Sequence, residues 1–351
     1  MKTRRVAPAK AKPTIRAVAD RAKVAISTVS RVLNGGPASA VVRGRVQTAI
    51  RELGYSPSIA AQSLVTRRAG CVGLAGNSSQ SPWFSQILGG IEEALATSRK
   101  SVVLASMMRS GRYDPSAVSA WIQDRRVDGL IFVRYARRDL PLFAAATRAG
   151  LPVVFIAPDA EAPADLIVRC NNVQAGDLVA RHLAELGHRR VAFAGGPRTS
   201  IDTRDRLKGL TEGLSGRGIS LRQRDVWFGA SYTAEAGAEY ARRFLGERSK
   251  SRPTAVVLGN DMMALAFIRA VLQAGVEVPR EVSVAGFDGI EAGGTCWPGL
   301  TTVVQPTRRM AATACEALLQ FVENREHDRA ATVAYGVELL VRESTAKARD
   351  A

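Results

Sequence analysis

The first seventy residues show apolar positions at helical spacing, separated by short polar turns. Ile15, Val18, Ala19 and Ala22 follow the i, i+3, i+4, i+7 pattern, which places them on one face of a helix. Thr14, directly before this pattern, is the expected N-cap because its hydroxyl can accept a hydrogen bond from the first turn. The sequence therefore predicts a short amphipathic helix close to the N-terminus.

Two further short helices are expected before residue 56. Val29, Val32 and Leu33 give a second apolar stripe, which ends at the Asn34–Pro37 turn sequence. A third helix runs from about Ser39 and ends at Gly54. Its apolar face consists of Val42, Val46, Ala49, Ile50 and Leu53. Three short helices with a tight turn between the first two are typical of a helix-turn-helix module.

After Gly70 the pattern changes to strands that alternate with helices. The β-branched runs CVGLAG, SVVLAS, VDGLIFV and LPVVFIA are separated by predicted helices over residues 84–98, 115–126 and 139–149. A second series begins at LIVRCN and continues with RVAFAGG, DVWFG, AVVLGN and VSVAGFD, with helices over 174–186, 203–217, 233–246 and 261–274. This alternation predicts two doubly wound α/β lobes with parallel sheets. A ligand is expected at the strand C-termini, in the cleft between the lobes.

The charge is concentrated in the predicted helical module. Residues 1–70 carry 14 Lys/Arg and two Asp/Glu, whereas the other 281 residues carry 35 and 30. A basic module on a nearly neutral body indicates a polyanionic partner, DNA or RNA, for that module. A solubilising arm or a membrane-surface arm is the alternative. The start of the chain, residues 1–13, reads as a disordered basic arm.

Length and composition restrict the class of protein. A chain of 351 residues with 46% hydrophobic residues and a mean hydropathy of −0.03 is expected to form more than one globular unit. No run of 18 apolar residues is present, and no apolar segment follows the basic start, so neither a membrane span nor a secretory signal is expected. The widely spaced Cys71, Cys170, Cys296 and Cys315 are expected to be free thiols in a reducing cytoplasm.

The segment TIRAVADRAKVAISTVSRVLNG, continued by VRGRVQTAIRELGYSP, closely resembles the DNA-binding headpiece of the LacI/GalR family of bacterial transcriptional repressors. RRVDGLIFV, HLAELGHRRVAF, LGNDMMALAFIRAVLQAG, PGLTTVVQP and VRESTA follow in that family's order and spacing. The resemblance implies a headpiece, a hinge helix and a core of two lobes like periplasmic binding proteins of type I. It also implies a homodimer whose affinity for double-stranded DNA is set by a small-molecule effector.

The resemblance gives boundaries to these parts. The headpiece covers residues 14–56 and the hinge helix with its linker covers 57–69. The effector-binding and dimerisation core covers 70–345. Within the core, the N-terminal lobe is expected at about 70–168 plus 300–330, and the C-terminal lobe at about 169–297 plus 331–345. The dimer is expected chiefly through the helix over 84–98 and its C-terminal counterpart. No apolar heptads follow the core, so no tetramerising coiled coil is expected.

The resemblance also assigns DNA contacts. Because Val29, Val32 and Leu33 pack inward, the second helix of the module presents its polar side to the major groove. Base-reading positions are Ile26, Ser27 and Arg31, and the arginine can bind guanine in a bidentate manner. Backbone contacts are expected from Thr14, Thr28, Ser30 and Asn34. Minor-groove contacts are expected from the hinge residues Ala61, Gln62 and Leu64, with Leu64 as a wedge between base pairs or, alternatively, as a packing residue against the core.

Two positions depart from the family's pattern. Ala25 stands where the family usually has serine before the recognition helix, which removes a side-chain cap. The helix is then expected to be frayed without DNA or to be capped one turn late by Ser27. Pro57-Ser58 stands where the family usually has Pro-Asn.

The predicted effector site combines polar and aromatic residues at strand ends. By resemblance it contains Ser81, Trp83, Phe84, Arg134, Arg204, Arg206, Asn260 and Asp288. Trp83 and Phe84 could stack on a ring, while Asp288 and Asn260 suit bonding to neighbouring hydroxyls. Asp261 and Asn172 are interpreted as helix caps rather than ligands. Arg134 has no evident partner, which favours an anionic effector such as a sugar acid over a neutral sugar.

The sequence lacks the motifs that are typical of other classes of function. No GxGxxG follows the first strand, and neither GxxxxGK[ST] nor GxSxG occurs, so an enzyme is not expected and no cofactor is implied. His182, His188 and His327 have no metal-ligand spacing, and His188 is interpreted as a turn or core residue. A transport-type sugar-binding protein would need a signal peptide and would have no headpiece. The prediction is a cytoplasmic, nucleoid-associated repressor of carbohydrate metabolism, with induction and corepression both open.

Overall fold

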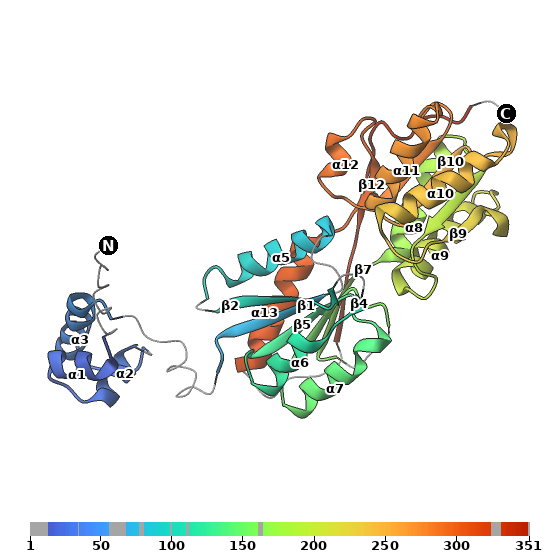
Figure 1. Ribbon diagram of the computed structural model, residues 1–351. Coiled ribbons are helices and arrows are strands. Elements are labelled where there is room, and N and C mark those ends of the chain that lie inside the picture. The colour runs from blue at the N-terminus through green and yellow to red at the C-terminus, as the bar shows by residue number, and fades with distance from the viewer. Residues whose placement is uncertain are drawn as a thin grey trace, which may run out of the picture. The chain divides into compact units, whose positions relative to one another are not determined.

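The computed structural model describes residues 13–33, 35–55, 68–76, 81–98, 100–109, 112–160, 164–323 and 331–349 (Figure 1). The chain divides into two compact units, one up to Ala69 and one from Gly70 onward, and each is described by itself. The first twelve residues of the predicted basic arm lie outside the described residues. So do residues 56–67, which contain the predicted hinge helix.

The headpiece contains the helices α1 (Ile15–Ala22), α2 (Ile26–Leu33) and α3 (Ala40–Leu53). The predicted cap at Thr14 is confirmed, because its hydroxyl accepts a hydrogen bond of 3.3 Å from the backbone N–H of Ala17. The apolar stripes converge on a small core made of Val18, Ala19, Ala22, Val29, Val32, Val46 and Ala49. Burial of these faces against one another fixes which side of each helix remains in water.

The first sheet of the core belongs to the N-terminal lobe and is parallel throughout. Its order is β13 (Ala331–Tyr335), β7 (Leu166–Cys170), β6 (Val153–Ile156), β5 (Gly129–Val133), β1 (Cys71–Gly76) and β2 (Ser101–Ser106). One face packs against α6 (Ser116–Gln123) and α7 (Leu140–Arg148). The other packs against α5 (Pro82–Leu95) and α13 (Thr307–Glu323). A short hairpin, β3 (Met108–Arg109) with β4 (Arg112–Tyr113), follows β2, and the 3-10 helix η1 (Arg137–Asp139) precedes α7.

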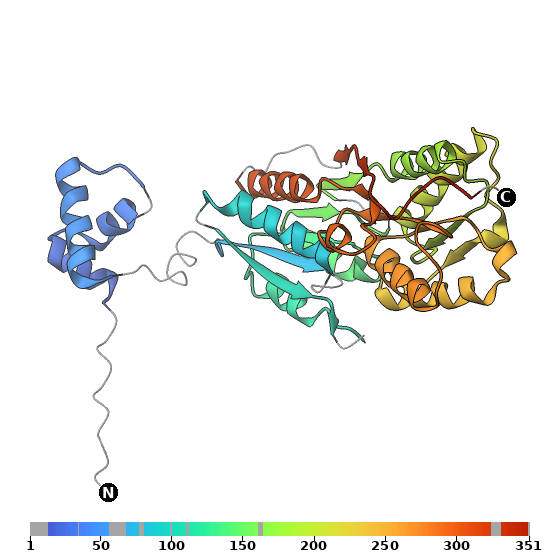
Figure 2. The same cartoon turned by 90° about the horizontal axis from the view of Figure 1, so that it is seen from above.

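The second sheet forms the C-terminal lobe. Its order is β14 (Glu338–Leu340), β12 (Thr301–Val304), β11 (Ser283–Asp288), β10 (Ala255–Leu258), β8 (Val191–Gly195) and β9 (Val226–Phe228). Only β14 among these described strands runs antiparallel to its neighbour. The helices α8 (Asn172–Glu185) and α9 (Ile201–Ser215) pack on one face, and α10 (Ala234–Gly246) and α11 (Asp261–Gln273) on the other (Figure 2). The short helix α12 (Ala292–Thr295) precedes β12, and the 3-10 helices η2 (Gln223–Asp225) and η3 (Ser249–Ser251) precede β9 and β10.

The predicted lobe boundaries agree to within two residues at the first passage between the lobes and are wrong at the other two. All of β7 belongs to the N-terminal sheet, so the first passage follows Cys170 and not residue 168. β12 pairs with β11 in the C-terminal sheet, although residues 300–330 were assigned to the N-terminal lobe. β13 pairs with β7 in the N-terminal sheet, although residues 331–345 were assigned to the C-terminal lobe. The chain therefore crosses between the lobes after β7, β12 and β13.

The C-terminal segment is held to the second sheet through a buried histidine. His188 Nδ1 lies 2.9 Å from the hydroxyl of Thr254, and Nε2 lies 3.0 Å from both the Ser283 hydroxyl and the Ala346 carbonyl. Burial lowers the pKa of His188, which keeps the ring neutral near pH 7. The interpretation of His188 as a core residue is therefore confirmed.

The state of the cysteines and the length of the described helices can be compared with the expectations from the sequence. Cys71, Cys170, Cys296 and Cys315 are all free thiols, as predicted. Within the described ranges, no helix has the length and hydrophobicity needed to cross a bilayer.

Candidate functional site

The recognition-helix residues lie on the solvent side of α2. Val29 is fully buried and Val32 nearly so, whereas Ile26 is 41% exposed. Ser27 and Arg31 are exposed, and Thr28 and Ser30 are half-buried. An exposed isoleucine beside a serine and an arginine offers apolar, hydrogen-bonding and cationic contacts on a single helix face. Asn34 and the hinge residues Ala61, Gln62 and Leu64 lie outside the described residues.

The start of α2 is well defined despite the absence of a side-chain cap. The helix begins at Ile26, and the carbonyl of Ala25 accepts hydrogen bonds from the N–H groups of Thr28 at 2.9 Å and Val29 at 3.2 Å. Ser27 lies inside the helix, so the expectation of a late cap at Ser27 is wrong. The first turn is held by packing of Val29 rather than by a cap.

A glycine turn places the side chain of Arg31. Gly35 has a φ of 74°, in the left-handed region that favours glycine. The N–H of Gly36 donates to the Arg31 carbonyl at 2.8 Å. A Cβ at Gly36 would lie 2.6 Å from Cγ of Arg31, so a larger residue there would displace the arginine stem.

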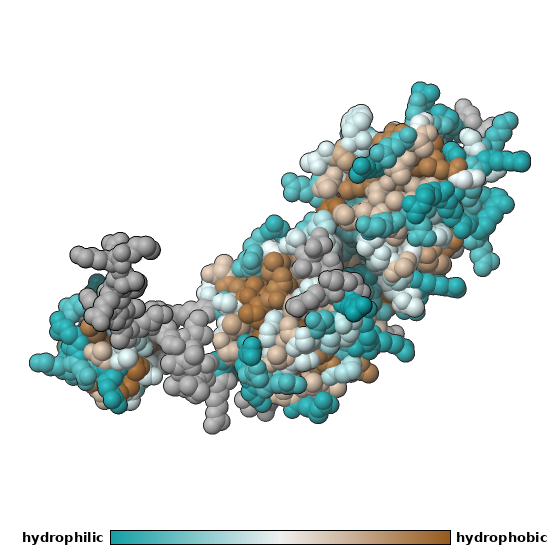
Figure 3. Space-filling view, in the orientation of Figure 1, coloured by the Kyte–Doolittle hydropathy of each residue, from teal (hydrophilic) through white to brown (hydrophobic). Residues whose placement is uncertain are grey.

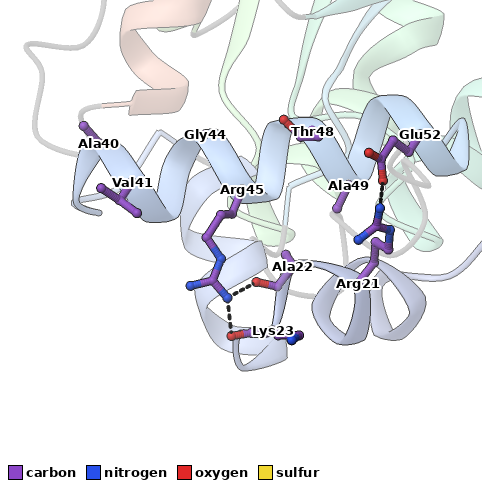
Figure 4. Close-up of a pocket in the computed structure, with 10 residues that line it drawn as sticks. All are labelled: Arg21, Ala22, Lys23, Ala40, Val41, Gly44, Arg45, Thr48, Ala49 and Glu52. Carbon is purple, nitrogen blue, oxygen red and sulfur yellow. Dashed lines mark hydrogen bonds and ion pairs between the residues drawn. The ribbon is translucent and has the colours of Figure 1, made fainter.

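A hollow in the headpiece lies between the end of α1 and α3 (Figure 4). The guanidinium of Arg45 donates to the carbonyls of Ala22 and Lys23, and Arg21 pairs with Glu52 at 2.6 Å. None of the residues that line it belongs to α2. These contacts hold α1 against α3. The hollow therefore lies at the contact between these two helices and not on the face that carries the recognition residues.

The polar residues of the core gather at the carboxyl ends of the strands, where the two lobes meet. Arg134 follows β5 and Asp159 follows β6 in the N-terminal lobe. The guanidinium of Arg134 donates to Asp159 at 2.6 Å and, across the cleft, to Asp202 at 2.9 Å and to the Ser200 hydroxyl at 3.3 Å. The same group lies over the ring of Tyr232, 4.7 Å from its centroid. The expectation that Arg134 has no partner is therefore wrong, and with it the argument for an anionic effector.

A second arginine is fully enclosed in the C-terminal lobe. Arg206 is 3% exposed, and its Nε donates to the Asn172 side chain at 2.8 Å while Nη1 donates to the Gly259 carbonyl at 2.5 Å. Nη2 lies 3.9 Å from Asp288, and the guanidinium stacks over Phe287 at 4.7 Å. These contacts fix the orientation of the planar group in a site that excludes water.

Asn172 connects the two arginines. Its side-chain N–H donates to Asp202 at 2.9 Å while its oxygen accepts from Arg206. The prediction that Asn172 is a helix cap is wrong, because the cap of α8 is Asn171, which accepts from the N–H of Gln174 at 3.0 Å. The prediction that Asp261 is a helix cap is also wrong. The cap of α11 is the preceding residue, Asn260, whose side-chain oxygen accepts from the N–H of Met263 at 3.0 Å.

Asp261 and Asp288 are buried carboxyls with different surroundings. Asp261 accepts from the Thr302 hydroxyl at 2.5 Å and from the N–H of Ile290 at 3.0 Å, both of them neutral donors. Burial raises its pKa, and the charge of Asp288 raises it further. Burial also raises the pKa of Asp288, but Arg206 and Arg134 offset part of that increase. Asp288 is therefore the better anion of the pair and the better acceptor for a ligand hydroxyl.

Gln305 joins Asp288 to the N-terminal lobe. Its amide N–H donates to Asp288 at 2.8 Å, and its oxygen accepts from the indole N–H of Trp83 at 3.1 Å. Trp83 and Phe84 are 7% and 4% exposed and pack in the core with Ile87, so they offer little ring surface to a ligand. Ser81 is half-buried and Arg204 is exposed to solvent. The structure thus brings Arg134, Arg206, Asn260, Asp288 and Trp83 into one network and leaves Arg204 outside it.

Sequence reasoning missed the residues that complete this network. They are Asp159, Asn172, Ser200, Asp202, Tyr232 and Gln305. Each lies just beyond the carboxyl end of a strand or at the start of the helix that follows, and that position was the available signal. Arg169, near the end of β7, pairs with Asp205 across the cleft at 3.8 Å.

Two family models match the chain. Residues 14–58 match the model described as bacterial regulatory proteins, lacI family. Residues 180–345 match the model described as periplasmic binding protein-like domain.

Curated relatives match over nearly the whole length. The HTH-type transcriptional repressor PurR of Photobacterium profundum is 30% identical, over 94% of this chain and 98% of its own length. The HTH-type transcriptional regulator CelR of Thermobifida fusca is 31% identical, over 95% of this chain and 98% of its own.

Solved structures show the same architecture. The lac repressor dimer bound to operator and the anti-inducer ONPF matches with a TM-score of 0.80 and 29% identity, covering 96% of this chain and 100% of that one. A complex of the regulator CelR with cellobiose matches with a TM-score of 0.71 and 30% identity, covering 95% and 99%. The predicted fold, a helix-turn-helix headpiece followed by two parallel-sheet α/β lobes, is confirmed. The chain belongs to the LacI family of bacterial regulatory proteins, as a DNA-binding transcriptional regulator with a ligand-binding core.

Proposed function

We propose that the protein is a repressor that binds a pseudo-palindromic operator as a homodimer and whose affinity is set by a sugar bound between its lobes. The observation that supports this most directly is the buried polar network at the strand ends, which joins the two lobes around Arg134 and Arg206. A repressor of this kind acts on the chromosome, which places the protein in the cytoplasm at the nucleoid.

On DNA, α2 lies in the major groove. Ile26, Ser27 and Arg31 read base edges, because they are the exposed side chains of that helix. Thr14, Thr28, Ser30 and Asn34 contact the phosphate backbone. Ala61, Gln62 and Leu64 of the hinge enter the minor groove, where Leu64 separates two central base pairs.

The Arg31→Ala variant tests the assignment of the recognition helix. It should lose discrimination at one base pair of each half-site, by about tenfold or more, because a bidentate contact to guanine contributes about 1–3 kcal/mol. Binding to non-specific DNA should remain and should keep its dependence on salt. The measurement is a titration of operator and of single-base operator variants at fixed ionic strength.

Arg51→Ala is the matched control, because Arg51 is an exposed arginine of α3 and its substitution removes the same charge. It should leave base discrimination unchanged. Full discrimination by Arg31→Ala would show that α2 does not read the operator through this residue.

The effector is a neutral sugar rather than a sugar acid. Around the cleft, Asp159, Asp202 and Asp288 outnumber Arg134 and Arg206, and both arginines already have carboxylate partners. A further negative charge would be buried without a cation to pair with it. Sugar hydroxyls could donate to Asp288 and Asp159 and accept from Asn260. The complex of the similar regulator CelR with cellobiose supports a carbohydrate effector.

Calorimetric titration of the full chain tests the effector class. A panel of neutral mono- and disaccharides and the matching aldonic acids should show binding of a neutral sugar, with its acid at least about tenfold weaker. Arg206→Met should abolish binding, while Arg204→Met, which changes an exposed arginine of the same helix, should not. Tighter binding of the acid would contradict the proposal.

The homodimer is formed through the N-terminal lobe around α5 and the edge strand β2. β2 ends the sheet, and its Leu104 is 41% exposed beside the half-buried Val102 and Val103. Figure 3 shows a hydrophobic area over α5 and β2. An apolar edge strand of this kind is normally covered, since it otherwise promotes aggregation. A second copy of the chain is the proposed cover, and the similar lac repressor is itself a dimer.

Leu104→Lys should convert the dimer to a monomer at micromolar concentration, because the lysine would have to be buried in the interface. Sedimentation velocity measures the change. Arg112→Lys, at another exposed position of the same lobe, should remain a dimer. A wild-type monomer, or a Leu104→Lys variant that stays dimeric, would refute the assigned interface.

A further inference from the structure

Arg134 has an unusual backbone. Its φ is 57°, in the left-handed region that residues with a side chain rarely occupy. The buried strand β5 ends at Val133, directly before Arg134, so this residue turns the chain out of the sheet. The consequence is that a long cationic side chain extends from the end of β5 into the cleft. Such conformations cost energy, and they persist where surrounding contacts compensate them.

The compensating contacts come from both lobes. In the N-terminal lobe, Asp159 accepts from Arg134 at 2.6 Å. In the C-terminal lobe, Asp202 accepts at 2.9 Å, and Tyr232 lies under the guanidinium. Ser200 of the C-terminal lobe also donates to Asp159 at 2.7 Å, so the N-terminal carboxylate is itself bound from the opposite side of the cleft.

The contact between Arg134 and Asp202 is largely buried, so it depends on the two lobes lying against each other. The side chains of Arg134 and Asp159 are 23% and 21% exposed, and that of Asp202 is 5% exposed. Asp202 is also held by Asn172, so it is fixed in its own lobe before Arg134 arrives. Charged hydrogen bonds in such a site are stronger than in water, and each charge needs a partner when water leaves. Opening the cleft would separate Arg134 from Asp202, Ser200 and Tyr232 together.

We propose that Arg134 acts as an internal ligand of the cleft, whose guanidinium bridges Asp159 of one lobe and Asp202 of the other and holds the lobes closed without effector. A ligand normally closes a two-lobed protein by bonding to both sides of the cleft, and this side chain makes the same kind of bridge. A neutral sugar leaves this charge-paired bridge in place and bonds to the groups around it. Arg134 thereby sets the resting conformation of the cleft that an effector meets.

Hydrogen–deuterium exchange of the ligand-free full chain tests this role. Arg134→Ala should raise exchange by about tenfold or more in peptides that cover the cleft residues 157–160, 199–206 and 229–233. Peptides from β8, β10 and β11 report whether the C-terminal lobe itself stays folded, and they should be unchanged. Arg137→Ala removes an exposed arginine three residues away and should match the wild type.

Chemical rescue separates closure by the guanidinium from a general effect of the substitution. Millimolar ethylguanidinium should restore slow exchange to the cleft peptides of Arg134→Ala, because it fits the vacated position between Asp159 and Asp202. It should do nothing for an Arg134→Ala/Asp202→Ala double variant. Unchanged cleft exchange in Arg134→Ala, or a fully exchanging cleft that ethylguanidinium does not protect, would overturn the proposal. These readouts involve neither DNA nor sugar, so they are independent of the proposed function.

Discussion

Charges buried where the two lobes meet must neutralise one another, and the arrangement of the core depends on this requirement. Hydrogen bonds connect Arg134 to Asp202, and Asn172 connects Asp202 to Arg206. An ion pair of 3.9 Å between Arg206 and Asp288 completes the set. Gln305 extends the set to Trp83 on α5. A change in the relative position of the lobes would therefore alter contacts from the cleft as far as α5, the helix that carries Trp83 and packs against α13. Parallel strands make this possible because their carboxyl ends lie at one edge of each sheet.

The headpiece follows a different constraint, that of a very small core. Its buried residues are mostly valine and alanine, and the packing of Val29 and Val32 decides which face of α2 remains in water. A hydrogen bond from the Arg45 side chain to the backbone carbonyl of Lys23, at the end of α1, adds a polar contact to that core. The exposed side chains of α2 are thus set by burial of the opposite face. The same residues that fold the module orient the surface available to DNA.

The helices and strands could be predicted from the sequence, but the pairing of some strands and the partners of some side chains could not. Periodicity located the three helices of the headpiece and most strands within a few residues, because burial on one face or two faces leaves a readable pattern. It could not assign β12 and β13 to their sheets, since strand pairing is a tertiary property that neighbouring residues do not encode. Resemblance pointed to Arg206, Asn260 and Asp288, and all three side chains lie at the strand ends of the C-terminal lobe. It could not show that Asp159 and Asp202 meet Arg134, because these residues are distant in sequence and only the tertiary structure brings them together. The sequence showed no partner for Arg134, and the two carboxylates that bind it remove that reason for expecting an anionic effector.

The central claim is that a dimer reads DNA through α2 and is controlled from the cleft. Selection of bound fragments from a random pool of double-stranded DNA by the purified full chain tests this most directly. The account predicts enrichment of an inverted repeat whose half-sites lie about one helical turn apart, as two recognition helices related by a two-fold axis require. Recovery of DNA without a shared sequence, or of a single unrepeated site, would contradict it.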